Sequence, residues 1–281
     1  MATITAADVK KLRDKTGAGM MDCKNALKEA DGDFVRAERI LKELGKAAAA
    51  KRSGRATNEG RIFVAVAGDS AAMVELACET DFVARNETFV ALGNEVVAEV
   101  LSRGLDEPDA VLTAKVADAI STIKENMSIQ RITRMSKGEN ELFAEYIHGD
   151  SGRMGGIVRV RVEDSALLDS EPVRNFAFDC ALHVVAFRPL FLSTEEVDPA
   201  YRKEQEEIFM TQARNMDKPE KVLPGIVQGK LRKLFAEICL LEQGFVKDEK
   251  TSVGNVAKAI GKEVGTTVSV TGFLTYTVGQ E

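Results

Sequence analysis

The sequence predicts an α+β protein with a three-helix module at its N-terminus, a duplicated core of antiparallel sheets and an inserted helical hairpin. Three observations support this prediction. The first 45 residues carry apolar side chains at helical spacing, the part beyond residue 60 alternates strand-like and helical patterns, and a Gly-Asp-Ser-x-x-Met turn occurs twice within that part. A chain of 281 residues is long enough for roughly two domains.

The first 45 residues are predicted to form a compact module of three short helices. Thr5 is placed to be the N-cap of the first helix, and Asp8 completes a capping box three residues later. Residues 16–19 end this helix, residues 31–33 separate the second helix from the third, and Gly45 is the predicted C-cap of the third. The apolar positions at helical spacing are Val9, Leu12, Cys23, Ala26, Leu27, Ala30, Phe34, Ala37, Leu41 and Leu44.

Residues 46–60 are basic and contain no large apolar side chain, so they are predicted to form a partly helical linker. The first core subdomain is predicted over residues 61–140. It opens with two strand-like segments, 61–67 and 72–78, which flank a Gly-Asp turn and therefore form a hairpin. Two helices and a strand over 129–135 follow. The buried faces of these helices are marked by Phe89, Leu92, Val96 and Val100, and by Val116, Ala119, Ile120 and Ile123.

The second core subdomain is predicted over residues 141–190 and 242–281, interrupted by an insertion over 191–241. Its strand-like segments 142–147 and 156–162 flank the second Gly-Asp-Ser-x-x-Met turn, and a helical pattern follows them. Two hairpins of the same form, each followed by a helix, indicate an internally duplicated α+β unit.

The insertion is predicted to be an αα-hairpin, the possible dimerisation element of the chain. Asp198 and Pro199 form a helix-start signal, an N-cap followed by proline at the first helical position. Helical patterns over 201–215 and 227–241 flank a proline-containing stretch over 217–225. The chain then returns to the core through a short helix and a final strand, at residues 253–260 and 268–278.

Composition and charge exclude several classes of function. The four cysteines lie far apart without the spacing of metal ligands, so free thiols are expected and neither a zinc site nor another cofactor is predicted. The net charge is −6, although residues 1–55 hold 13 Lys and Arg against 8 Asp and Glu, and an acidic total argues against nucleic-acid binding. Because no apolar run could span a membrane and no targeting signal opens the sequence, a cytoplasmic protein is expected.

Enzyme chemistry finds little support in the sequence. The Gly-Lys pairs at 229–230 and 261–262 lack the other residues of a phosphate-binding loop, so no direct nucleotide binding is predicted. Cys180 and His183 could meet on one helix, which leaves a thiol enzyme as an alternative. Cys180 lies on an apolar stripe, however, and buried cysteines are usually inert, so the core interpretation is favoured.

One strand-to-helix corner stands out, because it places Thr80, Asp81 and Phe82 between a strand and an amphipathic helix. In one interpretation Thr80 is an N-cap, Asp81 belongs to the first helical turn and Phe82 is a core residue. In the other, the carboxylate and the aromatic ring form a wedge for a partner protein. Met20 and Met21 leave a similar choice between core filling and an adaptable binding surface.

These motifs closely resemble the translation elongation factor Ts family, the guanine nucleotide exchange factors of elongation factor Tu. The matching segments are 16–24 (TGAGMMDCK) with Ala26 and Leu27, and 80–85 (TDFVAR). The resemblance covers essentially the whole chain. It implies that the N-terminal module is similar to ubiquitin-associated domains, that the core is two related subdomains, and that the inserted hairpin is a coiled-coil dimerisation element.

The resemblance also implies a function: the protein binds elongation factor Tu·GDP and promotes GDP release by disturbing the Mg²⁺ and phosphate site of that partner, without covalent chemistry. By the same analogy, the corner enters near the Mg²⁺ side of the partner. The residues carried over are Thr80, Asp81, Phe82 and Val83 at the corner, and Met20, Met21, Lys24, Lys51, Ile123 and His148 as further contacts.

The sequence departs from the family pattern at one place. Many bacterial members carry a further C-terminal helical segment that touches the partner, whereas this sequence stops after its last predicted strand, so that contact is expected to be missing here.

The main alternative function is a non-catalytic adaptor that binds through its module similar to ubiquitin-associated domains. RNA binding through the basic N-terminal part is a further alternative, which a weak salt dependence of binding would oppose.

Overall fold

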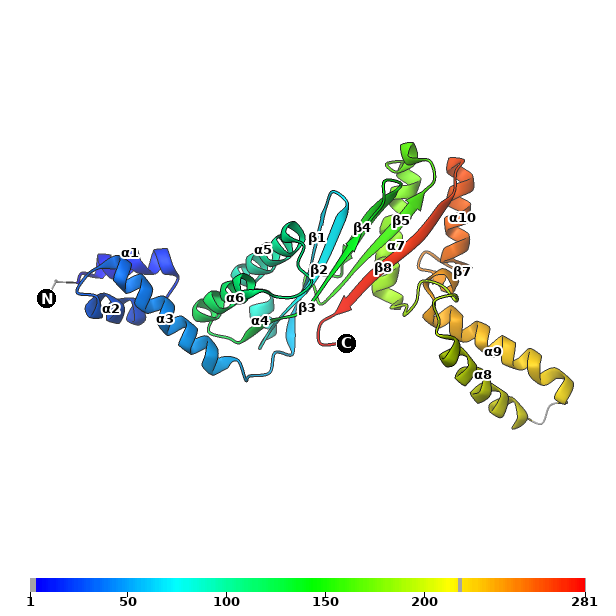
Figure 1. Ribbon diagram of the computed structural model, residues 1–281, viewed down its shortest axis with the longest axis horizontal. Helices are drawn as coiled ribbons and strands as arrows, with labels where there is room; N and C mark the ends of the chain where they lie inside the picture. The colour runs from blue at the N-terminus through cyan, green and yellow to red at the C-terminus, as the bar shows by residue number, and fades with distance from the viewer. Residues whose placement is uncertain (1–3, 217–218, 281) are drawn as a thin grey trace.

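The structure is a computed structural model that describes residues 4–216 and 219–280. It is elongated: a helical module at the N-terminus, a central core of two sheets and a protruding helical hairpin follow one another (Figure 1). All the paired strands of the two larger sheets are antiparallel, and helices and sheets alternate through the chain. The predicted α+β class is therefore confirmed. None of the described helices is long and apolar enough to cross a membrane.

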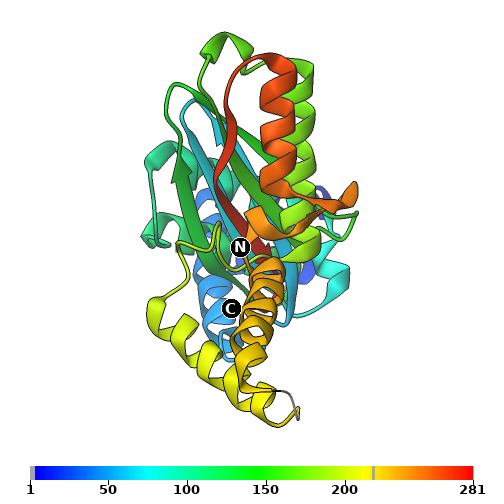
Figure 2. The same cartoon turned by 90° about the vertical axis from the view of Figure 1, so that its right-hand side faces the viewer.

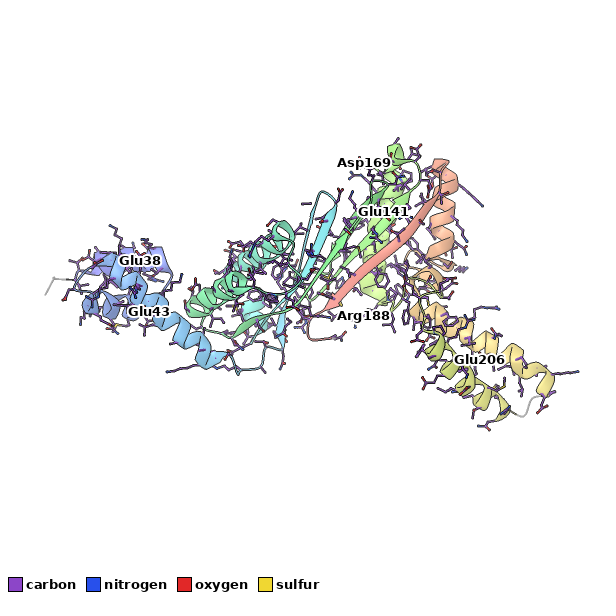
Figure 3. The ribbon with its side chains drawn as sticks, viewed as in Figure 1. Glu38, Glu43, Glu141, Asp169, Arg188 and Glu206 are labelled. Carbon is purple, nitrogen blue, oxygen red and sulfur yellow. The ribbon has the colours of Figure 1, made fainter. Side chains whose placement is uncertain are left out.

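The N-terminal module has its own core beneath three helices. These are α1 (Ala6–Thr16), α2 (Met20–Glu29) and α3 (Phe34–Arg52). The capping box of Thr5 and Asp8 is present, and Gly17 ends α1 in the left-handed conformation at φ 66°. An ion pair of 2.5 Å between Lys15 and Glu38 joins α1 to α3. Figure 3 labels Glu38 on α3. The buried core residues are Val9, Leu12, Cys23, Ala26, Leu27, Ala30, Ala37 and Leu41.

The prediction that Gly45 ends the third helix is wrong, because α3 continues to Arg52. Gly45 lies where α3 crosses α6 (Ala110–Ile123), and a Cβ atom there would come 2.7 Å from the Cβ of Ser121. This glycine therefore permits the close approach of two helices instead of terminating one. Leu44 is 53% exposed and lies outside the core of the module. The first part of the basic linker is helical, as predicted.

The first core sheet has the strand order β1–β2–β3, and its helices cover one face. The strands are β1 (Glu59–Ala67), β2 (Ser70–Cys78) and β3 (Met127–Ser136). The helices are α4 (Asp81–Ala84), α5 (Glu87–Arg103) and α6. Side chains alternate along β2: Ala72, Val74 and Leu76 pack beneath the helices, whereas Ala71 and Met73 face the second sheet.

The second core sheet follows the same plan, with the order β4–β5–β8. Its strands are β4 (Glu141–Ile147), β5 (Met154–Val162) and β8 (Val268–Thr277), and its helices are α7 (Glu171–Phe187) and α10 (Val253–Val264). Figure 2 shows α7 and α10 side by side over this sheet. The smaller elements near them are η1 (Ser165–Leu167), η3 (Leu240–Glu242), β6 (Gly244–Phe245) and β7 (Asp248–Ser252).

The two sheets face each other and enclose a cluster of apolar side chains, with helices on the outer faces (Figure 1). The buried members of this cluster are Ile62, Ala71, Met73, Ile157, Tyr276 and Val278. A buried ion pair of the first sheet borders the same interface: Arg131 of β3 lies 2.6 Å from Glu75 of β2. Arg131 also donates a hydrogen bond of 2.9 Å across the interface to the carbonyl of Thr277 in the second sheet. The guanidinium of Arg131 also lies 4.0 Å from the ring centre of Tyr276.

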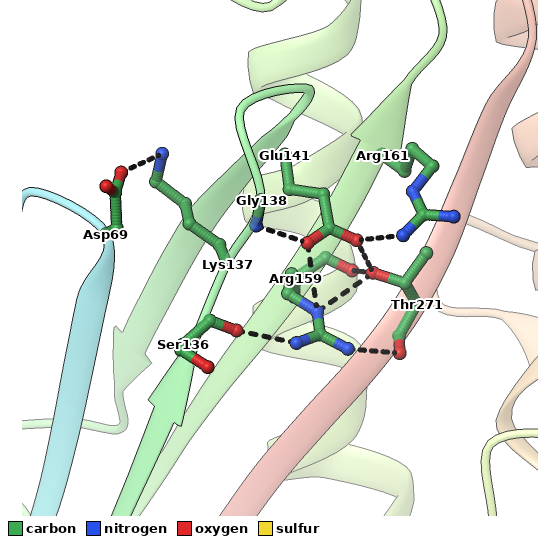
Figure 4. Close-up of polar contacts among 8 residues, drawn as sticks. All are labelled: Asp69, Ser136, Lys137, Gly138, Glu141, Arg159, Arg161 and Thr271. Carbon is green, nitrogen blue, oxygen red and sulfur yellow. Dashed lines mark hydrogen bonds and ion pairs between the residues drawn. The ribbon is translucent and has the colours of Figure 1, made fainter.

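A second polar network joins the sheets at their other end (Figure 4). Buried Glu141 accepts hydrogen bonds from the backbone of Gly138, from Thr271 and from Arg161, and it lies 3.6 Å from Arg159. Arg159 in turn donates to the carbonyl of Ser136 in β3. Burial raises the pKa of Glu141, but these donors and arginines outweigh it and hold the pKa below its usual value.

The helical hairpin projects from the second sheet and has its own apolar seam (Figure 1). It consists of α8 (Pro199–Arg214), η2 (Glu220–Val222) and α9 (Leu223–Ile238). Asp198 caps α8 by accepting a hydrogen bond from the amide of Ala200, as its sequence position predicts. Residues 217–218 of the predicted proline-containing stretch lie outside the described residues. Because the module, the two sheet layers and the hairpin each have a separate buried cluster, we retain the predicted domain boundaries as a proposal.

Candidate functional site

The corner between β2 and α4 carries the first four predicted site residues. Thr80 is the N-cap of α4, because its hydroxyl accepts a hydrogen bond of 3.3 Å from the amide of Val83, and this part of the prediction is confirmed. Phe82 is 81% exposed, so its interpretation as a core residue is wrong. The reason is the shortness of α4: Val83 and Ala84 already fill the space above the sheet, which turns Asp81 and Phe82 to solvent.

The backbone of this corner is fixed by the loop that leads from α6 to β3. Glu125 accepts two hydrogen bonds from Thr80, 3.0 Å from its amide and 2.7 Å from its hydroxyl. Glu79 accepts one of 2.6 Å from the amide of Asn126, which holds the pKa of Glu79 below its usual value against the effect of partial burial. Arg55 lies 3.3 Å from Glu79 and adds to that shift. The exposed ring of Phe82 therefore stands on a well-anchored turn.

Asp81 is available for a new interaction. Its carboxylate pairs with Arg85 at 3.4 Å, one helical turn away, and both side chains are at least half exposed. Ion pairs of this kind stabilise a fold only slightly because both groups are well solvated. A partner that offers a cation or a hydrogen-bond donor could therefore replace Arg85 at little cost.

Met20, Met21 and Lys24 lie on the first turns of α2 and are exposed, Met20 at 44% and Met21 at 64%. The core-filling alternative for the two methionines is therefore wrong. The interior position of this turn is taken by Cys23, which is fully buried. Asp22 lies 3.3 Å from Lys124, so this surface is attached to the end of α6, close in sequence to the loop that fixes the corner.

His148 is exposed in the turn between β4 and β5, where its Nδ1 atom lies 3.0 Å from the hydroxyl of Tyr146. The same turn contacts the start of β1: the amide of Ile62 donates to the carbonyl of Gly152, and Arg153 forms an ion pair with Glu59. Glu59 is paired with Cys78 at the end of β2, two residues before Thr80. His148 and the corner therefore lie at the same end of the core.

The two remaining predicted contacts differ in accessibility. Lys51 is exposed on the last turn of α3. Ile123 is partly buried, because it packs against the buried cluster of the first subdomain at the end of α6. The structure thus places the Phe82 corner and the His148 turn at one end of the core, and the pair of Asp22 and Lys124 joins the methionine turn of the module to the residues beside that corner. Glu125, which no sequence pattern singled out, is bonded to the corner from 45 positions away.

The thiol-enzyme alternative conflicts with the surroundings of Cys180 and His183. Burial raises the pKa of the Cys180 thiol far above its usual value, which disfavours the reactive thiolate. The amide of Val246 donates to Nδ1 of His183 at 3.1 Å, so Nε2 carries the ring proton and donates to Gln243 at 3.0 Å. Both ring nitrogens are therefore already engaged. Within residues 4–216 and 219–280, no group of three or more His, Cys, Asp or Glu side chains could hold a metal ion.

The buried state of His183 predicts a loss of stability in mild acid. Burial lowers its pKa below the value of about 6.5 expected in the unfolded chain, and the bond to Gln243 only partly opposes this. The unfolded state therefore binds the extra proton first, and stability falls as the pH drops below about 6.5, with a slope approaching 1.4 kcal/mol per pH unit, about that of one proton. Urea unfolding between pH 8 and pH 5.5 measures this slope. The variant His183→Gln should lose it, and an unchanged slope in that variant would contradict the assignment.

The fold and the site together define an α+β protein whose predicted functional residues, most of them exposed, lie on a helical module and two facing sheets. The family model described as Elongation factor TS matches residues 79–280. The chain is 43% identical over 276 residues to Elongation factor Ts of Treponema denticola, covering 98% of each chain. It is 44% identical over 277 residues to that of Borrelia recurrentis, covering 99% of this chain and 100% of the relative. Over 279 residues it is 40% identical to that of Borreliella burgdorferi, with the same coverage.

The chain therefore belongs to the elongation factor Ts family, a family of translation factors. The matched region of the family model contains the Phe82 corner and the His148 turn, and the curated relatives extend the match over the N-terminal module. The resemblance drawn from the two sequence motifs is thus confirmed at the level of the family.

Proposed function

We propose that the protein is a cytoplasmic guanine nucleotide exchange factor that binds elongation factor Tu·GDP and promotes GDP release during translation elongation. Membership of the family supports this function in general. The observation that carries it in detail is Phe82, a large apolar side chain that is 81% exposed on a turn held by several hydrogen bonds. An exposed aromatic residue on a rigid support is typical of the residues that dominate protein interfaces.

The mechanism acts on the Mg²⁺ and phosphate site of the partner. A GTPase holds GDP through backbone amides around the phosphates and through a Mg²⁺ ion with strict octahedral geometry, so a small displacement of the elements behind that site weakens the nucleotide. Asp81 and Phe82 enter near the Mg²⁺ side and displace those elements. Thr80 and Val83 hold the wedge through the cap of α4.

The other exposed surfaces extend the contact. His148 presses on the phosphate-binding side from the second subdomain, while the methionine turn docks on a helix of the partner's nucleotide-binding domain. The flexible, polarisable side chains of Met20 and Met21 suit an apolar surface, and the ammonium group of Lys24 suits a carboxylate beside it. Lys51 and the exposed part of Ile123 flank this surface.

Exchange of this kind is negative coupling between two ligands of one partner. The factor binds the nucleotide-free partner better than the GDP-bound partner, and thermodynamic reciprocity then requires that GDP expel the factor. No covalent step is needed. The test is gel filtration of the protein with elongation factor Tu: the two should elute together after nucleotide and Mg²⁺ are removed, and separate when both are added in excess. If the two proteins elute in the same way with and without GDP, the proposed coupling is refuted.

A second copy of the chain is a further proposed partner, through the hairpin of α8 and α9. The hairpin projects from the core and leaves apolar side chains exposed near its helices, among them Ile208 and Met216. Apolar side chains on a projecting helical surface favour self-association. Sedimentation equilibrium measures the mass directly: a dimer that becomes monomeric in the double variant Ile208→Glu/Met216→Glu supports this partner, and a monomeric wild type opposes it.

A further inference from the structure

The segment of six consecutive residues 121–126 contacts both the N-terminal module and the Phe82 corner. A Cβ atom at Gly17 would lie 3.1 Å from Cγ2 of Thr122, just as Gly45 lies against Ser121, so the module packs directly on this segment. Lys124, in the left-handed conformation at φ 70°, pairs with Asp22 of the module. The next two residues turn to the corner, where Glu125 binds Thr80 and Asn126 binds Glu79.

Glu125 determines which way the hydroxyl of Thr80 points. The carboxylate can only accept hydrogen bonds, so the single hydroxyl proton of Thr80 is donated to Oε1 at 2.7 Å. The lone pairs of that hydroxyl are then free to accept the hydrogen bond from the amide of Val83. This hydrogen bond is the N-cap of α4. The amide of Thr80 donates to Oε2 at the same time, so the backbone before the helix is held as well.

The direction of Phe82 depends on this cap. An isolated helix of four residues is not stable by itself, because helix initiation is unfavourable and the first turn has no preceding bonds. The Phe82 ring, being largely exposed, gains little orientation from packing within the chain. The capped turn that Glu125 holds is therefore what fixes the exit direction of its side chain.

We infer that Glu125 is a positioning residue for nucleotide exchange: its carboxylate orients the cap of α4 so that Phe82 meets the partner in one direction. This inference rests on the proposed function. A merely structural role would make Glu125 important for stability but independent of Phe82. A positioning role makes its effect on exchange disappear when the ring of Phe82 is absent.

The experiment is a double-mutant cycle on the acceleration of GDP release from elongation factor Tu. Glu125→Gln keeps the size of the side chain but can accept from only one of the two Thr80 donors, so exchange should fall about tenfold, as expected for the loss of one hydrogen bond to a charged group. In the Phe82→Ala background the same change should alter exchange less than about twofold, because the two residues act as one unit. Equal effects in both backgrounds would overturn the inference.

Two further measurements keep the outcomes distinct. Glu95→Gln is the matched control, since it removes a carboxylate from an exposed ion pair with Lys115 in the same subdomain. This variant should leave the rate of nucleotide exchange unchanged. Amide hydrogen exchange followed by NMR reports on the cap without the partner: Glu125→Gln should accelerate exchange of the Thr80 and Val83 amides. Unchanged amides would overturn the positioning role, whereas wild-type protein that fails to accelerate GDP release would instead refute the proposed function.

Discussion

Replacing Phe82 by alanine is expected to slow nucleotide exchange by about 10- to 150-fold while the melting temperature hardly changes. The side chain is 81% exposed in the free protein, so its removal deletes few contacts there, and surface changes of this kind alter stability by less than about 0.5 kcal/mol. Burial of a phenylalanine at an interface is worth about 1.5–3 kcal/mol, and each 1.4 kcal/mol corresponds to a factor of ten. Stopped-flow GDP release and thermal unfolding measure the two quantities separately.

Val66→Ala is the matched control for that variant. Val66 is also an exposed apolar residue of the first subdomain, but it is paired with Ala71 beside the Gly68 turn, at the end of the hairpin away from the Phe82 corner. It should keep full exchange activity. A Phe82→Ala protein that loses stability and activity in proportion, or that retains full activity, would contradict the role of Phe82 as a wedge.

The largest expected loss of stability follows from replacing Arg131 by methionine. Glu75 is 3% exposed between the two sheets and depends on Arg131 for charge compensation. Without the guanidinium, a carboxylate remains buried with the amide of Gly279 as its remaining donor, and the carbonyl of Thr277 loses a hydrogen bond. Breaking a buried ion pair in this way typically costs about 3–5 kcal/mol. Urea unfolding of the variant against the wild type gives the difference in the free energy of unfolding.

Two controls separate the buried charge from other effects of this substitution. The double variant Glu75→Gln/Arg131→Met removes both charges and should recover a large part of the lost stability, because no unpaired carboxylate stays behind. Arg39→Met breaks an exposed pair with Glu43 on α3 and should have a much smaller effect. A double variant as unstable as Arg131→Met alone would show that packing, and not the charge of Glu75, determines the loss.

The local features of the fold could be predicted because their signals lie within a few residues of one another. The capping box of Thr5 and Asp8 and the apolar face of α2 were both confirmed. Gly45 was assigned wrongly because a glycine that ends a helix and a glycine that admits a neighbouring helix look alike in sequence. Only the position of Ser121, 76 residues away, distinguishes them.

The residues of the candidate site could be predicted from a sequence motif, but the exposure and the contacts of their side chains could not. The residue types of the corner indicated an N-cap at Thr80, yet whether Phe82 is buried depends on how much space α4 leaves above the sheet. Likewise, the alternating pattern of β2 gave no partner for Glu75, because Arg131 lies opposite it on β3, 56 residues later, in a strand register that no local signal specifies. Glu125 was missed for the same reason, since its role exists only through contact with Thr80.

Stopped-flow fluorescence measures directly whether this protein releases GDP from elongation factor Tu through its exposed corner. Elongation factor Tu loaded with fluorescent GDP is mixed with excess unlabelled GDP and increasing amounts of the protein at fixed Mg²⁺ concentration. The release rate should rise with the concentration of wild-type protein and rise far less with Phe82→Ala. A folded wild-type protein that leaves the release rate of its cognate partner unchanged would contradict the proposed function.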